Sequence, residues 1–152
     1  MVKRESISIY LRSGTLSWID KNPLEHSRCA SVSTAAEWGI LQLRRGARSA
    51  FKKLDDDERG AVIYGISNLV WDFTQQSTES LVSHYEEWFE VDFGRYLEWD
   101  EVMIGSLLNK LKTLNSSEVA GLICWAKGYW SEREKKPDLQ IGDYANDLSR
   151  LV

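Results

Sequence analysis

The chain has 152 residues, of which 43% are hydrophobic and 11% aromatic, and its formal net charge is −4. Seven tryptophans and only two prolines exclude an intrinsically disordered chain and argue against long linkers. No run approaches the roughly 18 apolar residues of a membrane span, and no signal-peptide core is present, so we expect a cytoplasmic protein without a membrane partner.

The first predicted element is a strand over residues 6–11, where polar and apolar side chains alternate with period two. One face carries Ile7, Ile9 and Leu11, and the other carries Ser6, Ser8 and Tyr10. A single short strand needs a partner, and the following residues look helical, so we expect it to pair with the same strand of a second copy. Such a two-stranded ribbon has the size of the DNA major groove.

Two helices are predicted next. The first runs through residues 15–20 and ends before Pro23, which cannot continue a helix. After a polar loop over residues 22–30, the second helix is expected to begin within residues 31–34, with Glu37 completing a capping box. Cations that suit the negative pole of the helix dipole gather at its far end: Arg44, Arg45, Arg48, Lys52 and Lys53.

Together these elements resemble a ribbon-helix-helix domain, the fold of the Arc and methionine repressors. The resemblance is carried by the apolar spacing from Ile7 to Ile19 and by the serine-rich stretch 31–34. It implies a dimer that reads DNA bases through the outward strand residues Ser6, Ser8 and Tyr10. It also implies a phosphate grip at the start of the second helix, by Ser31, Val32 and Ser33. Further phosphate contacts are expected from Lys3, Arg4 and Arg12.

The charge distribution divides the chain near Leu54. Residues 1–54 carry 10 basic and 4 acidic side chains, a net charge of +6. Residues 55–152 carry 9 basic and 19 acidic side chains, a net charge of −10. Such asymmetry indicates two roles. We predict a DNA-binding and dimerisation module over residues 1–54, and a domain for oligomerisation or for binding a partner or effector over residues 55–152.

The acidic half reads as five helices, which makes the predicted fold mainly α with one N-terminal strand. Carboxylates at residues 55–58 open the first of these helices, and Asn115 with Glu118 is expected to cap the fourth. Apolar residues recur at helical spacing throughout, from Val62 onward. The tryptophans exceed the needs of a core, so some are expected in an interface or groove.

No signature of catalysis, metal binding or a cofactor is found in the sequence. Phosphate-binding glycine loops and nucleophile or metalloprotease motifs are absent, and neither His26 nor His84 has a cysteine at metal-binding spacing. The isolated Cys29 and Cys124 fit a reducing compartment. We therefore expect a protein that is not an enzyme and needs no cofactor.

The leading hypothesis is a sequence-specific DNA-binding transcriptional regulator, a repressor of bacterial or phage type, that inserts a β-ribbon into the major groove. It would bind double-stranded DNA as a homodimer or higher homo-oligomer, and its acidic half would receive a protein or small-molecule signal. The alternative is an acidic all-α interaction module, or a phage-type inhibitor, that binds a basic protein and no DNA.

Overall fold

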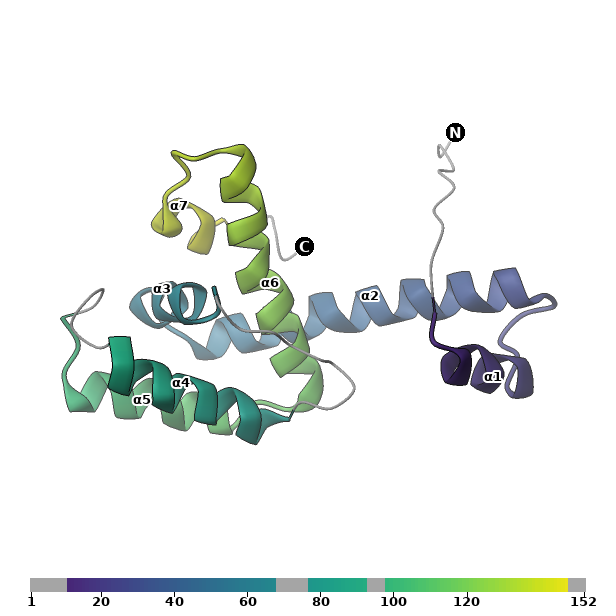
Figure 1. Ribbon diagram of the computed structural model, residues 1–152, viewed down its shortest axis with the longest axis horizontal. Coiled ribbons are helices and arrows are strands. Elements are labelled where there is room, and N and C mark those ends of the chain that lie inside the picture. The colour runs from purple at the N-terminus through teal and green to yellow at the C-terminus, as the bar shows by residue number, and fades with distance from the viewer. Residues whose placement is uncertain (1–10, 68–76, 93–97, 148–152) are drawn as a thin grey trace. The chain divides into compact units, whose positions relative to one another are not determined.

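The computed structural model describes residues 11–67, 77–92 and 98–147, and these residues form seven helices (Figure 1). Their bounds are α1 Ser13–Lys21, α2 Arg28–Lys53, α3 Asp56–Gly65, α4 Thr78–Asp92, α5 Glu101–Lys112, α6 Ser116–Lys135 and α7 Ile141–Ala145. No strand occurs among the described residues. The mainly-α fold class is therefore confirmed.

The prediction of a ribbon-helix-helix domain with an N-terminal strand is wrong. Residues 1–10, which include nearly all of the expected strand, lie outside the described residues, and Leu11 lies in no strand. The second helix also differs, because α2 is one continuous helix of 26 residues that begins at Arg28. The alternation over residues 6–11 was too short to establish a strand without partner residues to pair with.

The early start of α2 has a local cause. Ser27 Oγ accepts a hydrogen bond from the backbone N–H of Ala30 at 3.2 Å, so Ser27 caps the N-terminus of the helix. Ser31, expected near the helix start, instead accepts the backbone N–H groups of Leu24 and Glu25 at 3.2 and 3.0 Å. The prediction of an N-cap within residues 31–34 is therefore wrong. By contrast, α1 ends at Lys21 as Pro23 predicted.

The chain divides into two compact units, residues 1–40 and 41–152. The division predicted at Leu54 concerned function, and it stays a prediction. The second unit contains the C-terminal part of α2 together with α3 to α7, and holds nearly all of the buried apolar residues. Its fully buried large side chains are Val62, Ile63, Ile66, Leu81, Tyr85, Leu107, Leu111, Leu122, Ile123 and Tyr129.

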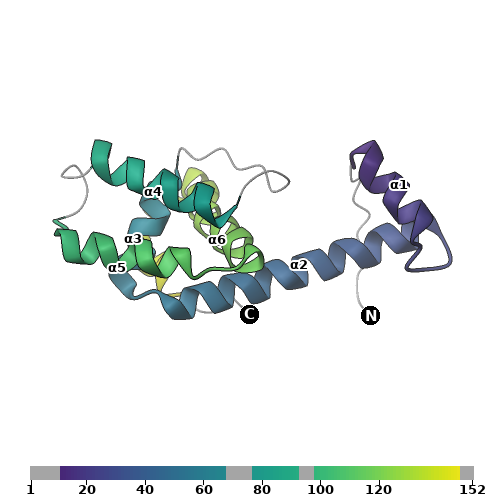
Figure 2. The same cartoon turned by 90° about the horizontal axis from the view of Figure 1, so that it is seen from below.

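Within the second unit, α4 and α5 lie side by side and run in opposite directions (Figures 1 and 2). Helix α3 contacts both α6 and α7, and α4 also contacts α6. The expected cap of α6 is confirmed, since Asn115 forms a reciprocal capping box with Glu118, and Asp100 caps α5 by accepting the N–H of Met103. Helical phase and caps therefore place the elements of this unit largely as the sequence predicted.

Helices α2 and α6 approach each other closely because two glycines meet at their crossing. A Cβ atom on Gly121 would overlap the backbone of Leu43 and Ala47, and one on Gly46 would overlap the carbonyl group of Ser117. No other residue type fits at these positions without separating the helices. The crossing brings the cations of α2 close to the N-terminal turn of α6.

Candidate functional site

The N-terminal hairpin, which we define as the described residues 11–40, is held together mostly by polar contacts. Arg28 donates from Nε to Asp20 Oδ1 at 2.7 Å and forms an ion pair with the same carboxylate through Nη2. This hydrogen bond holds the pKa of Asp20 below its ordinary value. Thr34 donates to Glu25 at 3.2 Å. These contacts, with the buried Ser31 hydroxyl, fold the connection between α1 and α2 back onto α2.

The hairpin leaves four of its large apolar side chains in solvent. Trp18 is 59% exposed, Leu24 50%, Trp38 64% and Ile40 57%. Only Ile19, at 4% exposure, is a buried apolar residue among residues 11–40. Scattered apolar residues are normal on a surface, but two tryptophans and two aliphatic residues within so short a segment make it a candidate interaction surface. The expectation that some tryptophans lie in an interface or groove stays a prediction, for which the exposed Trp18 and Trp38 are candidates.

The structure places the predicted DNA contacts only in part. The base-reading residues Ser6, Ser8 and Tyr10 and the phosphate contacts Lys3 and Arg4 lie outside the described residues. Arg12 is exposed just before α1, and Ser33 is exposed in α2. Val32 is half-buried, and Ser31 is buried with its hydroxyl bound to the hairpin connection. Roles implied by the ribbon-helix-helix resemblance are left without a fold to support them.

The C-terminal part of α2 carries a basic surface. Arg44, Arg45, Arg48 and Lys52 are all exposed, and residues 45, 48 and 52 follow the three-and-four spacing of one helix face. The opposite face of the same turns is buried through Ala47, Ala50, Phe51 and Leu54. No acidic residue interrupts residues 41–54. We call these four cations the basic face.

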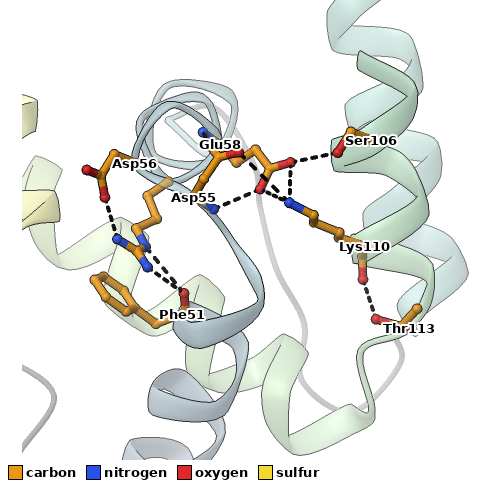
Figure 3. Close-up of polar contacts among 8 residues, drawn as sticks. Phe51, Asp55, Asp56, Glu58, Ser106, Lys110 and Thr113 are labelled. Atoms are coloured by element: carbon orange, nitrogen blue, oxygen red, sulfur yellow. Dashed lines mark hydrogen bonds and ion pairs between the residues drawn. The ribbon is translucent and has the colours of Figure 1, made fainter. Parts of the chain in front are cut away.

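A buried carboxylate that sequence reasoning did not single out joins α3 to α5 (Figure 3). Glu58 accepts Lys110 Nζ at 2.8 and 2.6 Å, Ser106 Oγ at 3.0 Å and the backbone N–H of Asp55 at 2.8 Å. Its oxygens are thereby fully engaged, although Glu58 is almost completely buried. The arrangement has the properties of a structural clamp, because the carboxylate has no acceptor position left for a substrate.

A second clamp with the same chemistry joins α6 to α2. Glu118 accepts Ser49 Oγ at 2.5 Å, Lys53 Nζ at 2.8 Å and the backbone N–H of Asn115 at 2.9 Å. Burial alone would raise the pKa of this carboxyl, but the hydrogen bonds from Lys53 and Ser49 hold it below its ordinary value. The capping boxes were visible in the sequence, whereas the lysine and serine partners are distant in the chain.

The histidine near two carboxylates, His84, has a structural role. Its Nε2 lies 2.6 Å from the carbonyl oxygen of Gly65, and its ring packs edge-on against Tyr85. Tyr85 donates to the carbonyl oxygen of Val62 at 2.6 Å, and its burial raises its pKa far above the ordinary value. These contacts join α4 to α3.

The described residues contain no group of three or more histidine, cysteine, aspartate or glutamate side chains that could hold a metal ion. None of their helices is both long enough and apolar enough to span a membrane. Comparison of the chain with protein-family models, with curated proteins and with solved structures finds no match.

Proposed function

We propose that this chain is an all-α interaction protein that assembles with a second copy of itself through the N-terminal hairpin. The observation that carries the proposal is the imbalance within residues 11–40, where one apolar residue is buried and four large ones are exposed. Covering one such side chain contributes about 1.5–3 kcal/mol. A hairpin with so small a core gains most of its stability from the surface that covers it.

A second copy is the occupant that the charges favour. Residues 11–40 carry three basic and three acidic side chains, so the described hairpin has no net charge. Two copies therefore meet without repulsion, whereas a nucleic acid or a strongly charged protein would gain no charge complementarity from this surface. Two helical hairpins that pack together make a four-helix bundle, and twofold dimers are the commonest closed assemblies.

The test compares two matched substitutions of exposed β-branched residues. Ile40→Asp places a charge in the proposed interface, and Val102→Asp places one at the start of α5, where Val102 is 79% exposed. Size-exclusion chromatography with light scattering measures the mass of each variant. We expect Ile40→Asp to be monomeric while Val102→Asp remains dimeric like the unmodified chain. A monomeric unmodified chain, or a dimeric Ile40→Asp variant, would contradict the proposal.

The basic face supports a second candidate function, the binding of double-stranded DNA. Exposed cations at helical spacing attract phosphates whatever the base sequence, and their binding releases counterions. The four cations of the basic face lie on one helix in a stretch without acidic residues, while residues 55–152 carry a net charge of −10. A dimer would double this basic surface. If the cations of α2 contact the phosphates, the chain can bind DNA without a β-ribbon.

Fluorescence anisotropy with a random-sequence DNA duplex over a series of salt concentrations tests this candidate. We expect affinity to fall steeply with salt, and Arg45→Gln to weaken binding and to reduce the salt slope by about one. Lys135→Gln, which removes an exposed cation at the end of α6, is the matched control and should change neither. Absence of binding at low salt would favour the alternative, in which the acidic residues 55–152 bind a basic protein.

A further inference from the structure

A cavity of about 400 Å³ lies where α2, α6 and α7 meet in the second unit. Gly121 leaves it room, because this position of α6 has no side chain. Its apolar lining comes from Leu43 and Ala47 of α2, Trp125 of α6 and Tyr144 of α7. Arg44 and Cys124 line it as well. The volume falls within the range of small-molecule sites, about 300–1,000 Å³.

One polar atom of this lining has an unfulfilled hydrogen bond. The indole N–H of Trp125 is buried and has no hydrogen-bond partner, which distinguishes it from every other side-chain polar atom buried among the described residues. Tyr144, beside it, is fully used because its hydroxyl donates to the carbonyl oxygen of Trp125 at 2.6 Å. This nitrogen is closed to solvent, so a molecule in the cavity contacts the ring of Trp125 and not its N–H.

The cavity also has a cation available to a ligand. Arg44 is exposed and forms no ion pair or hydrogen bond with the described part of the chain. The neighbouring Arg45 does not line this cavity but lines the groove beside the first turn of α6. A mostly apolar, open cavity with one unpaired guanidinium is complementary to a molecule with an apolar body and an anionic group.

We propose that this cavity binds a small aromatic carboxylate. The ring packs against Trp125 and Tyr144, and the carboxylate pairs with Arg44. This inference is independent of the proposed self-association, because all of the lining residues lie within residues 41–152. It gives the second unit a small-molecule site of a defined chemical class.

The test uses phenylacetate and its uncharged analogue phenylacetamide with the full chain. The thiol of Cys124, which is exposed and lines the cavity, reports occupancy through its rate of alkylation once Cys29, also exposed, is replaced by Ser. We expect phenylacetate to slow alkylation of Cys124 and to change tryptophan fluorescence with the same dissociation constant. Phenylacetamide should bind about tenfold more weakly, because it cannot form the charge-assisted pair.

Two variants distinguish the proposed site from nonspecific binding. Arg44→Gln should weaken phenylacetate binding to the level of phenylacetamide, whereas Arg45→Gln, its matched control, should leave binding unchanged. Because both side chains are exposed, neither change should disturb folding. The proposal is overturned if phenylacetate fails to protect Cys124, if the amide binds as well as the acid, or if both variants lose affinity equally.

Discussion

Glu58 and Glu118 occupy equivalent positions in two different helices. Each is the third residue of its helix, closes a capping box with Asp55 or Asn115, and is almost completely buried. Each also binds a serine and a lysine that lie four residues apart on another helix. Glu58 binds Ser106 and Lys110 (Figure 3), and Glu118 binds Ser49 and Lys53. The same device therefore secures α3 to α5 and α6 to α2.

Replacing Lys110 should lower the free energy of unfolding more than replacing its partner Glu58. Lys110→Met leaves the buried carboxylate of Glu58 unpaired, so we expect a loss of about 3–5 kcal/mol in the free energy of unfolding. Glu58→Gln retains the cap and leaves Lys110, which is partly exposed and can be hydrated, so we expect only about 1–3 kcal/mol. Urea unfolding measures both. Equal costs would contradict the clamp.

A matched control for this pair is Lys112→Met, on the same helix. Lys112 is largely exposed, and its Nζ lies 3.9 Å from Glu86 at the surface. Exposed ion pairs of this kind contribute about 0–1 kcal/mol. We therefore expect Lys112→Met to unfold almost as the unmodified chain does, with the difference from Lys110→Met arising from burial of the carboxylate.

The second clamp predicts a dependence of stability on pH. The pKa of Glu118 in the folded chain is below its ordinary value of 4.5. Its contribution is therefore fully present above about pH 4.5 and is lost as the pH falls through the lower folded pKa. Glu118→Gln removes this contribution, so the difference in unfolding free energy between the two proteins should shrink below pH 4.5. A difference that is constant with pH would contradict the assignment.

The glycine crossing predicts opposite effects for two alanine substitutions. Gly121→Ala would force Cβ into the backbone of Leu43 and Ala47, so it should destabilise the chain by several kcal/mol, on the order of a severe core mutation. Gly105→Ala has open space around the new Cβ within α5 and should stabilise by about 0.5–1 kcal/mol. Thermal unfolding of the two variants measures both signs. A neutral Gly121→Ala would show that the helices do not meet there.

Local signals in the sequence predicted much of this fold. Pro23 marked the end of α1 and Asn115 marked the start of α6, because caps and breakers act over a few residues. The start of α2 was missed, since the Ser31 hydroxyl binds the preceding loop instead of capping a helix. Local rules offered two competing uses for that hydroxyl.

The candidate sites were harder to predict than the elements that carry them. The partners of Glu58 and Glu118 come from helices more than forty residues away, at separations of 52 and 65 residues for the lysines. Helical spacing placed Ile40 on the apolar side of α2 with Leu43, yet Ile40 is exposed and Leu43 is half-buried. The pattern identifies an apolar face, but the tertiary structure decides whether the same chain covers it.

The connection between α1 and α2 should depend on one buried hydroxyl, that of Ser31. Ser31→Ala removes the acceptor for the N–H groups of Leu24 and Glu25, so the connection between α1 and α2 should lose protection against hydrogen exchange. Ser33→Ala, at an exposed position of the same helix, is the control and should exchange normally. Unchanged protection of residues 24 and 25 in Ser31→Ala would show that the loop is held by other contacts.

The central claim, assembly of two copies through the hairpin, is tested most directly by sedimentation equilibrium of the unmodified chain over a dilution series. The mass of one chain is 17.5 kDa. We predict that the average mass rises with concentration and levels off at twice that value, because one self-complementary surface pairs two copies and is then covered. A mass that stays at 17.5 kDa at every concentration would contradict the account.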